Sequence, residues 1–221
     1  MSVVGHMVEL YFGSWGGSKG GSGLSVDGFK LLADAHEYLM AAVRGVPEEA
    51  WGAATPCSEW TVRQVYHHAR LDQQALTMQI TGQAPESDPF EPVDALAGDG
   101  AEAVMRLEAT LGAALKAWES GREAESVATP MGPMPAQAGA MVAALDAAVH
   151  AWDIARATGQ DLPLTEDMAE RLELPAGQVV EFVRQSFGKF APVVEIPADA
   201  SRADKFLAFT GRDPYWSATT G

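Results

Sequence analysis

The segment Ala138–Thr158, AGAMVAALDAAVHAWDIARAT, decides the fold class. It is rich in alanine, the residue with the highest helix propensity, and it is followed by Gly159, a residue type that commonly ends helices. Its larger apolar residues recur at the three- and four-residue spacing of a helix that buries one face. These residues are Val142, Leu145, Val149 and Trp152. The segment therefore predicts a long amphipathic helix.

Other segments share this periodicity, so we expect an all-α protein. Thr61 and Gln64 form a capping-box pattern that marks the start of a second helix, and Gly82 follows its expected end. Residues 83–98 are polar and carry prolines, which indicates a loop. The further long helices are expected at Phe29–Val43, Thr61–Thr81 and Ala101–Ser120, with shorter ones near Glu166–Leu172 and Gly177–Ser186. Together they predict an antiparallel four-helix bundle with short extra C-terminal helices.

Polar side chains stand beside the apolar face of the first segment, and they are the candidates for chemistry. Asp146 and His150 are four residues apart, so they project from the same side of a helix and can converge on one point. His68, in the Thr61–Thr81 segment, lies on the stripe that faces the bundle. One carboxylate and two imidazoles are a common ligand set for a divalent metal ion that keeps positions open for water or substrate. The candidate metal ligands are therefore His68, Asp146 and His150.

Each of these residues also has a simpler interpretation. His68 fits a core histidine bonded to a carbonyl or water, and Asp146 with His150 fits an ordinary helical pair at the solvent edge. Asp153 is expected to hold the His150 imidazole in place by a hydrogen bond, or to form a salt bridge with Arg156 or another basic group.

Composition excludes several classes of protein. The 221 residues are 47% hydrophobic, enough for one domain with a substantial core. The net charge of −15, without a basic run, disfavours nucleic acid and anionic membrane surfaces as partners. No apolar run is long enough for a membrane span. The single cysteine, Cys57, fits a reducing cytoplasm, and its loop carries no activating base nearby, so we expect a buried and inert thiol.

Residues 1–23 differ in composition from the rest of the chain. Residues 13–23, GSWGGSKGGSG, have glycine at most positions, as flexible linkers do. We expect a tag-like or flexible N-terminal arm here, followed by one bundle domain at 24–221. The alternative is a native arm that docks on a neighbouring molecule.

Three ordered blocks resemble one known family. Residues 55–62 read TPCSEWTV and precede His68, residues 149–159 read VHAWDIARATG, and residues 206–214 read FLAFTGRDP. These blocks are similar to those of actinobacterial DinB-like proteins, which are related to the N-terminal domain of mycothiol-dependent maleylpyruvate isomerase. The resemblance covers residues 25–216.

The resemblance implies a DinB-type four-helix bundle with a divalent ion between its helices, and the family ligands carry over to His68, Asp146 and His150. Zinc is the expected ion, with nickel or another divalent ion as alternatives. A low-molecular-weight thiol of the mycothiol type is the implied cosubstrate, and a homodimer is a possible assembly because family members are often dimers. Relatives with isomerase activity carry a glutamate ligand, so Asp146, one methylene shorter, predicts a different metal preference.

Three functions are compatible with these patterns. The first is a metal-dependent thiol S-transferase that acts on a small electrophile. The second is a metal-dependent hydrolase that uses the same three residues, and the third is a non-catalytic helical module for binding or dimerisation. Too few residues follow the bundle for the full C-terminal domain of the isomerase, so we expect a reaction other than maleylpyruvate isomerisation.

Deletion of residues 1–23 is expected to leave the melting temperature nearly unchanged. A glycine-dense segment buries little apolar surface and so contributes little to the stability of the bundle. Thermal unfolding of the full chain and of the shortened chain measures this directly. A large drop on deletion would show that the arm docks as a structural element.

Overall fold

A computed structural model describes residues 26–91, 99–129 and 132–218. The expected N-terminal arm, residues 1–23, lies outside the described residues. Within them the protein is all-α, with only two isolated β-bridges. None of the helices in these ranges combines the length and the apolar character that a membrane span needs. The helices are α2 (Gly28–Arg44), α3 (Val62–Thr81), α4 (Gly100–Ser120), α5 (Ala136–Ala157), α6 (Glu166–Phe187) and α7 (Arg202–Phe209), with a 3-10 turn η2 (Glu48–Ala50).

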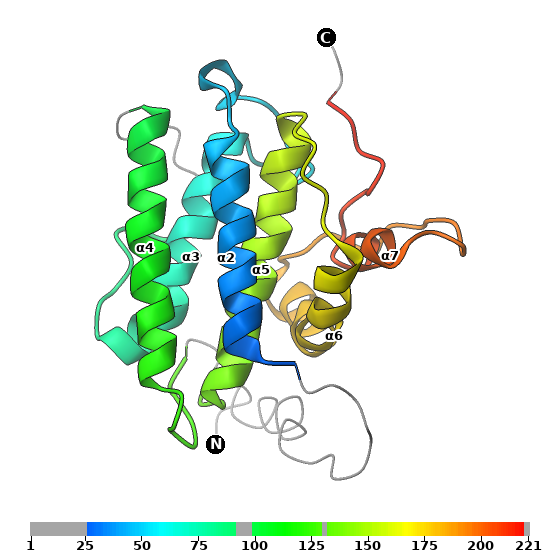
Figure 1. Ribbon diagram of the computed structural model, residues 1–221. Coiled ribbons are helices and arrows are strands. Elements are labelled where there is room, and N and C mark those ends of the chain that lie inside the picture. Colours follow the sequence, from blue (N-terminus) through cyan, green and yellow to red (C-terminus); the bar gives the residue numbers. More distant parts are fainter. Residues whose placement is uncertain (1–25, 92–98, 130–131, 219–221) are drawn as a thin grey trace.

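Four of these helices, α2 to α5, form the predicted bundle (Figure 1). Helices α2 and α5 run in one direction and α3 and α4 in the other, so the two pairs are antiparallel to each other. Two hydrogen bonds fix this arrangement at one end: Gln160, after α5, donates to the carbonyl of Ala42 in α2, and Tyr66 in α3 donates to the carbonyl of Ala103 in α4. After α3, residues 82–91 turn back toward the start of that helix, where the carbonyl of Pro89 lies beside His68.

The start of α3 is set by the local sequence, as predicted. The Thr61 side chain accepts from the backbone N–H of Gln64, and the Gln64 side chain accepts from the backbone N–H of Thr61. Gly82 ends the helix in the left-handed conformation, with φ of 70°. These two local signals fix the position of His68 along the helix.

The C-terminal part of the protein differs from the sequence prediction. Instead of two short helices, α6 is one helix of 22 residues that continues through Pro175. A proline inside a helix costs about 3 kcal/mol. Here the apolar stripe continues on both sides of the proline and packs on the bundle, which offsets that cost. The buried residues of this stripe include Met168, Leu172, Ala176, Val179 and Val180. Helix α7, which we did not predict, packs against α6.

Helix α5 contacts α2, α3, α4 and α6, and nearly all of its residues are buried. Its many alanines allow neighbouring helices to come close. Polar groups on such a helix cannot be solvated, so they must be paired inside the protein. His150 is 6% exposed and Asp153 is 0% exposed, so the alternative interpretation that placed this polar strip at the solvent edge is wrong.

Gly139 of α5 provides a test of this close packing. A Cβ atom added there would overlap two ring carbons of the buried Trp118 in α4. Gly139→Ala is therefore expected to destabilise the protein by about 1–3 kcal/mol, although alanine is the better helix former. The matched control is Gly112→Ala in α4, where an added Cβ atom would have no neighbour within 4 Å outside the adjacent backbone of its own helix. It should stabilise the protein by about 0.5–1 kcal/mol. Urea unfolding measures both, and equal effects at the two sites would contradict the packing.

Candidate metal centre

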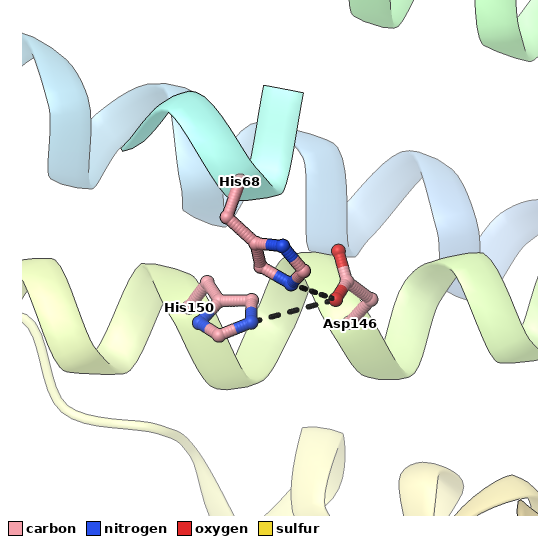
Figure 2. A group of neighbouring side chains, drawn as sticks. All are labelled: His68, Asp146 and His150. Atoms are coloured by element: carbon pink, nitrogen blue, oxygen red, sulfur yellow. Dashed lines mark ion pairs between the residues drawn. The ribbon is translucent and has the colours of Figure 1, made fainter. Parts of the chain in front are cut away.

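The structure brings His68 from α3 together with Asp146 and His150 from α5 (Figure 2). Nε2 of His68 lies 3.6 Å from Oδ1 of Asp146, and Nε2 of His150 lies 3.5 Å from the same oxygen. No two of the three ligand atoms are more than 4.8 Å apart. Both imidazoles are buried, and the Asp146 side chain retains 17% exposure.

The far side of the His150 ring is held by a buried ion pair. Nδ1 of His150 lies 3.0 Å from Oδ2 of Asp153, and Arg212 donates to the same oxygen at 3.0 Å. Burial alone would raise the pKa of Asp153, but the Arg212 guanidinium holds this pKa below its usual range. The ionised carboxylate only accepts hydrogen bonds, so Nδ1 of His150 carries the proton and Nε2 presents its lone pair to Asp146.

The far side of the His68 ring is held by the backbone. Nδ1 of His68 lies 2.8 Å from the carbonyl oxygen of Pro89, which can only accept, so the free lone pair is again on Nε2. The loop that carries Pro89 is attached to α3 by Glu86, which accepts two hydrogen bonds from the buried Arg70. Both imidazoles therefore have the tautomer that a metal ligand requires.

Aromatic side chains flank the two imidazoles. The Trp60 ring centroid lies 4.6 Å from that of His68 and 6.5 Å from that of His150. Phe90 packs at 5.2 Å from His68 and is 43% exposed. Such apolar neighbours lower the local polarity and strengthen electrostatic interactions at the site.

Burial and mutual contacts shift the pKa values of the three residues in different directions. Burial lowers the pKa of His150 and outweighs the attraction of Asp146. Burial has the same effect on His68, but there the hydrogen bond and charge of Asp146 dominate and the pKa is raised. Burial would raise the pKa of Asp146, yet the two imidazoles hold it below its usual range. The half-buried Asp72, one turn after His68, has a pKa raised to about 7 by burial and by the charge of Asp146.

The donor set fits a divalent ion. Ligand atoms that bind one zinc ion at about 2.0–2.1 Å lie about 3.3 Å apart at tetrahedral angles, close to the two nitrogen–oxygen separations observed here. Two neutral imidazoles and one carboxylate suit zinc and other borderline divalent ions. Three protein ligands also leave a further position for an exogenous ligand.

Cys57 is half-buried, and its thiol is unreactive at neutral pH. Burial, together with the negative charge of Asp153, raises the pKa of Cys57 to about 11. A thiol with this pKa is almost entirely protonated at neutral pH and is a poor nucleophile. This agrees with the expectation of an inert thiol.

Two groups at the site were not assigned a role from the sequence. Arg212 belongs to the block at residues 206–214. The sequence signal that could have identified it is that Asp153, a charged residue on an otherwise apolar helix, needs a basic partner. Arg156, the partner considered for Asp153, instead donates to the carbonyl of Trp216. The Pro89 carbonyl carries no sequence signal, because any residue has a backbone carbonyl.

Comparison with known proteins identifies the family. Residues 32–155 match the family described as "Mycothiol maleylpyruvate isomerase N-terminal domain". Uncharacterized proteins from two strains of Mycobacterium tuberculosis are each 31% identical over 180 residues, which is 81% of this chain and 92% of theirs. The chain is thus a helical-bundle protein, and it belongs to the mycothiol maleylpyruvate isomerase N-terminal domain family.

Solved structures confirm the fold. The crystal structure of the mycothiol-dependent maleylpyruvate isomerase aligns with a TM-score of 0.55 at 15% identity, and a histidine-to-alanine mutant of it with 0.54 at 14%. Each alignment covers 81% of this chain and 86% of the other. An alignment over 86% of the isomerase chain does not agree with our expectation that too few residues follow the bundle for a C-terminal domain.

The metal centre predicts the effect of removing either imidazole. Because each supplies one of only three protein ligands, His68→Ala and His150→Ala should each lose most of the bound metal in elemental analysis of protein purified without a nickel column. His67→Ala, the same change next to His68, is the control and should bind as much metal as the wild type. Full metal content in both His68→Ala and His150→Ala would rule out this site.

Proposed function

We propose that the protein is a metal-dependent thiol S-transferase that uses a mycothiol-type thiol and a small electrophilic substrate. The observation that carries the proposal is the convergence of two imidazole lone pairs and one carboxylate oxygen, with each imidazole fixed from behind by an acceptor. Family membership supports a thiol as the cosubstrate, since mycothiol dependence is part of the description of the solved relatives.

Zinc or another divalent ion, when bound by His68, Asp146 and His150, would lower the pKa of a coordinated thiol so that the thiolate is present near neutral pH. In the transfer, the thiol sulfur forms a bond to an electrophilic carbon and the thiol proton passes to solvent. The electron pair displaced from that carbon departs with a leaving group or takes up a proton.

The other residues of the site contribute orientation and a low-polarity surface. Asp153 and the Pro89 carbonyl each face an Nδ1 atom and hold the ring proton there, so Nε2 is the ring atom left to bind an ion. Trp60 and Phe90 offer apolar surface beside the reacting groups, which excludes water from part of the site. Cys57 has no role in this scheme, because its thiol is protonated at neutral pH.

The alternatives predict different outcomes in one assay. A hydrolase using the same residues would need no added thiol. An isomerase would form a product with the same elemental composition as its substrate. A non-catalytic module would turn over nothing, and the short distance between His68 and His150 counts against it.

The proposal predicts that turnover requires both metal and thiol. An electrophilic test substrate is incubated with mycothiol, with a simple thiol and with none, and the products are analysed by mass spectrometry. A thioether product that forms fastest with mycothiol is expected. Equal turnover in all three reactions would reject the transferase and favour hydrolysis, and an isomeric product with regenerated thiol would favour isomerisation.

Two variants separate the site from the rest of the protein. Asp146→Ala should lose turnover together with metal affinity. Cys57→Ser replaces the thiol by a hydroxyl of similar size, at a residue outside the ligand set. It should keep most of its turnover, because the reacting thiol comes from the cosubstrate. Loss of turnover in a folded, metal-loaded Cys57→Ser protein would contradict the scheme.

A further inference from the structure

A hydrogen-bonded chain of side chains links three helices behind the metal centre. Nε2 of His36 in α2 lies 2.9 Å from Oε1 of Gln73 in α3. Nε2 of Gln73 donates to the carbonyl of Ala143 in α5 at 3.1 Å and makes a longer contact of 3.5 Å with Oδ2 of Asp146. The chain therefore ends on the carboxylate oxygen that does not face the two imidazole ligands.

The direction of every bond in this chain is determined by its acceptors. A carbonyl and a carboxylate only accept, so the end of Gln73 that faces them must be the NH₂ group. Oε1 then faces His36, and Nε2 of His36 must carry the proton. Nδ1 of His36 is left without a proton, and it has no hydrogen-bond partner among the described residues. Burial also lowers the pKa of His36 to about 4, so the ring stays neutral near neutral pH.

Such a chain is costly in a protein core. Gln73 is 0% exposed and His36 is 3% exposed, while the surrounding residues of α2 and α5 are mostly apolar. Burying polar groups costs free energy unless every group is paired, and here one ring nitrogen is not. An apolar pair would fill the same space without this cost. The position of the chain against Asp146 gives it a use that an apolar pair lacks.

We propose that Gln73, oriented by His36, is a positioning residue that keeps Asp146 a one-oxygen ligand. Its NH₂ group contacts Oδ2 at 3.5 Å while Oδ1 faces the two imidazoles, so a bound ion would keep the position that Oδ2 could otherwise take open for the thiol. A carboxylate can bind a metal through one oxygen or two, and a second bound oxygen would fill a coordination position. This inference rests on the proposed metal site and goes beyond it by assigning control of the open position.

The test uses cobalt(II) in place of zinc, because the intensity of its visible absorption bands falls as the coordination number rises. In Gln73→Met, which keeps the length of the side chain but removes the donor, these bands should weaken relative to the wild type. The thiol concentration that half-saturates the sulfur-to-cobalt charge-transfer band should rise about tenfold. Gln79→Met, the same change at an exposed position of the same helix, should match the wild type.

A double variant protects the test against loss of folding. In His36→Leu/Gln73→Met both polar partners are replaced by apolar groups of similar size, which is often neutral for stability. It should fold with wild-type stability and show the same cobalt spectrum as Gln73→Met. A purely structural chain would instead change the stability and leave the spectrum of the bound cobalt unaltered, which would overturn the proposal.

A measurement on the wild type needs no variant. Two-bond hydrogen–nitrogen NMR spectra distinguish the two neutral tautomers of histidine, and His36 is expected to carry its proton on Nε2. The Nδ1–H tautomer would mean that the Gln73 amide is reversed and points its oxygen at Asp146, which overturns the proposal. Failure of the wild type to bind cobalt at all would refute the metal site and, with it, this inference. A wild-type spectrum shared by Gln73→Met would refute the inference alone.

Discussion

The buried ion pair between Asp153 and Arg212 is the interaction on which the site depends. It joins the bundle to the segment after α7, and it fixes the ring of His150 through the same carboxylate oxygen. Both partners are almost fully buried, so removing either one would leave an unpaired charge in the core, at a cost of about 3–5 kcal/mol. The C-terminal segment thus contributes to the geometry of a site whose proposed ligands all lie on α3 and α5.

The same design is repeated for each proposed ligand. His150 is held by Asp153 and His68 by the Pro89 carbonyl, and the NH₂ group of Gln73 makes a longer contact with Asp146 that we propose has the same role. Each supporting group binds the atom that faces away from the centre and leaves one ligand atom facing inward. Supporting contacts of this kind cost stability when they are buried, and they are common around metal ions because they set tautomer and orientation before the ion binds.

Much of the fold was predictable from local sequence signals. Helix periodicity, the Thr61–Gln64 capping box and Gly82 located the four long helices, because these signals act within a few residues of one another. The prediction for the C-terminal part was wrong at Pro175, where the local rule predicts a break. The continuous apolar stripe of α6 packs on the bundle, and this tertiary contact outweighs the local cost.

For the candidate site, the sequence by itself determined that Asp146 and His150 share a helix face, because a spacing of four residues in a helix permits nothing else. It also indicated that His68 faces the bundle. Only the tertiary structure decided the rest: that His68 reaches Asp146 from another helix, that Arg212 rather than Arg156 pairs with Asp153, and that Gln73 and His36 stand behind the carboxylate. These contacts join residues far apart in the chain, and helix packing, which no local pattern encodes, sets their distances.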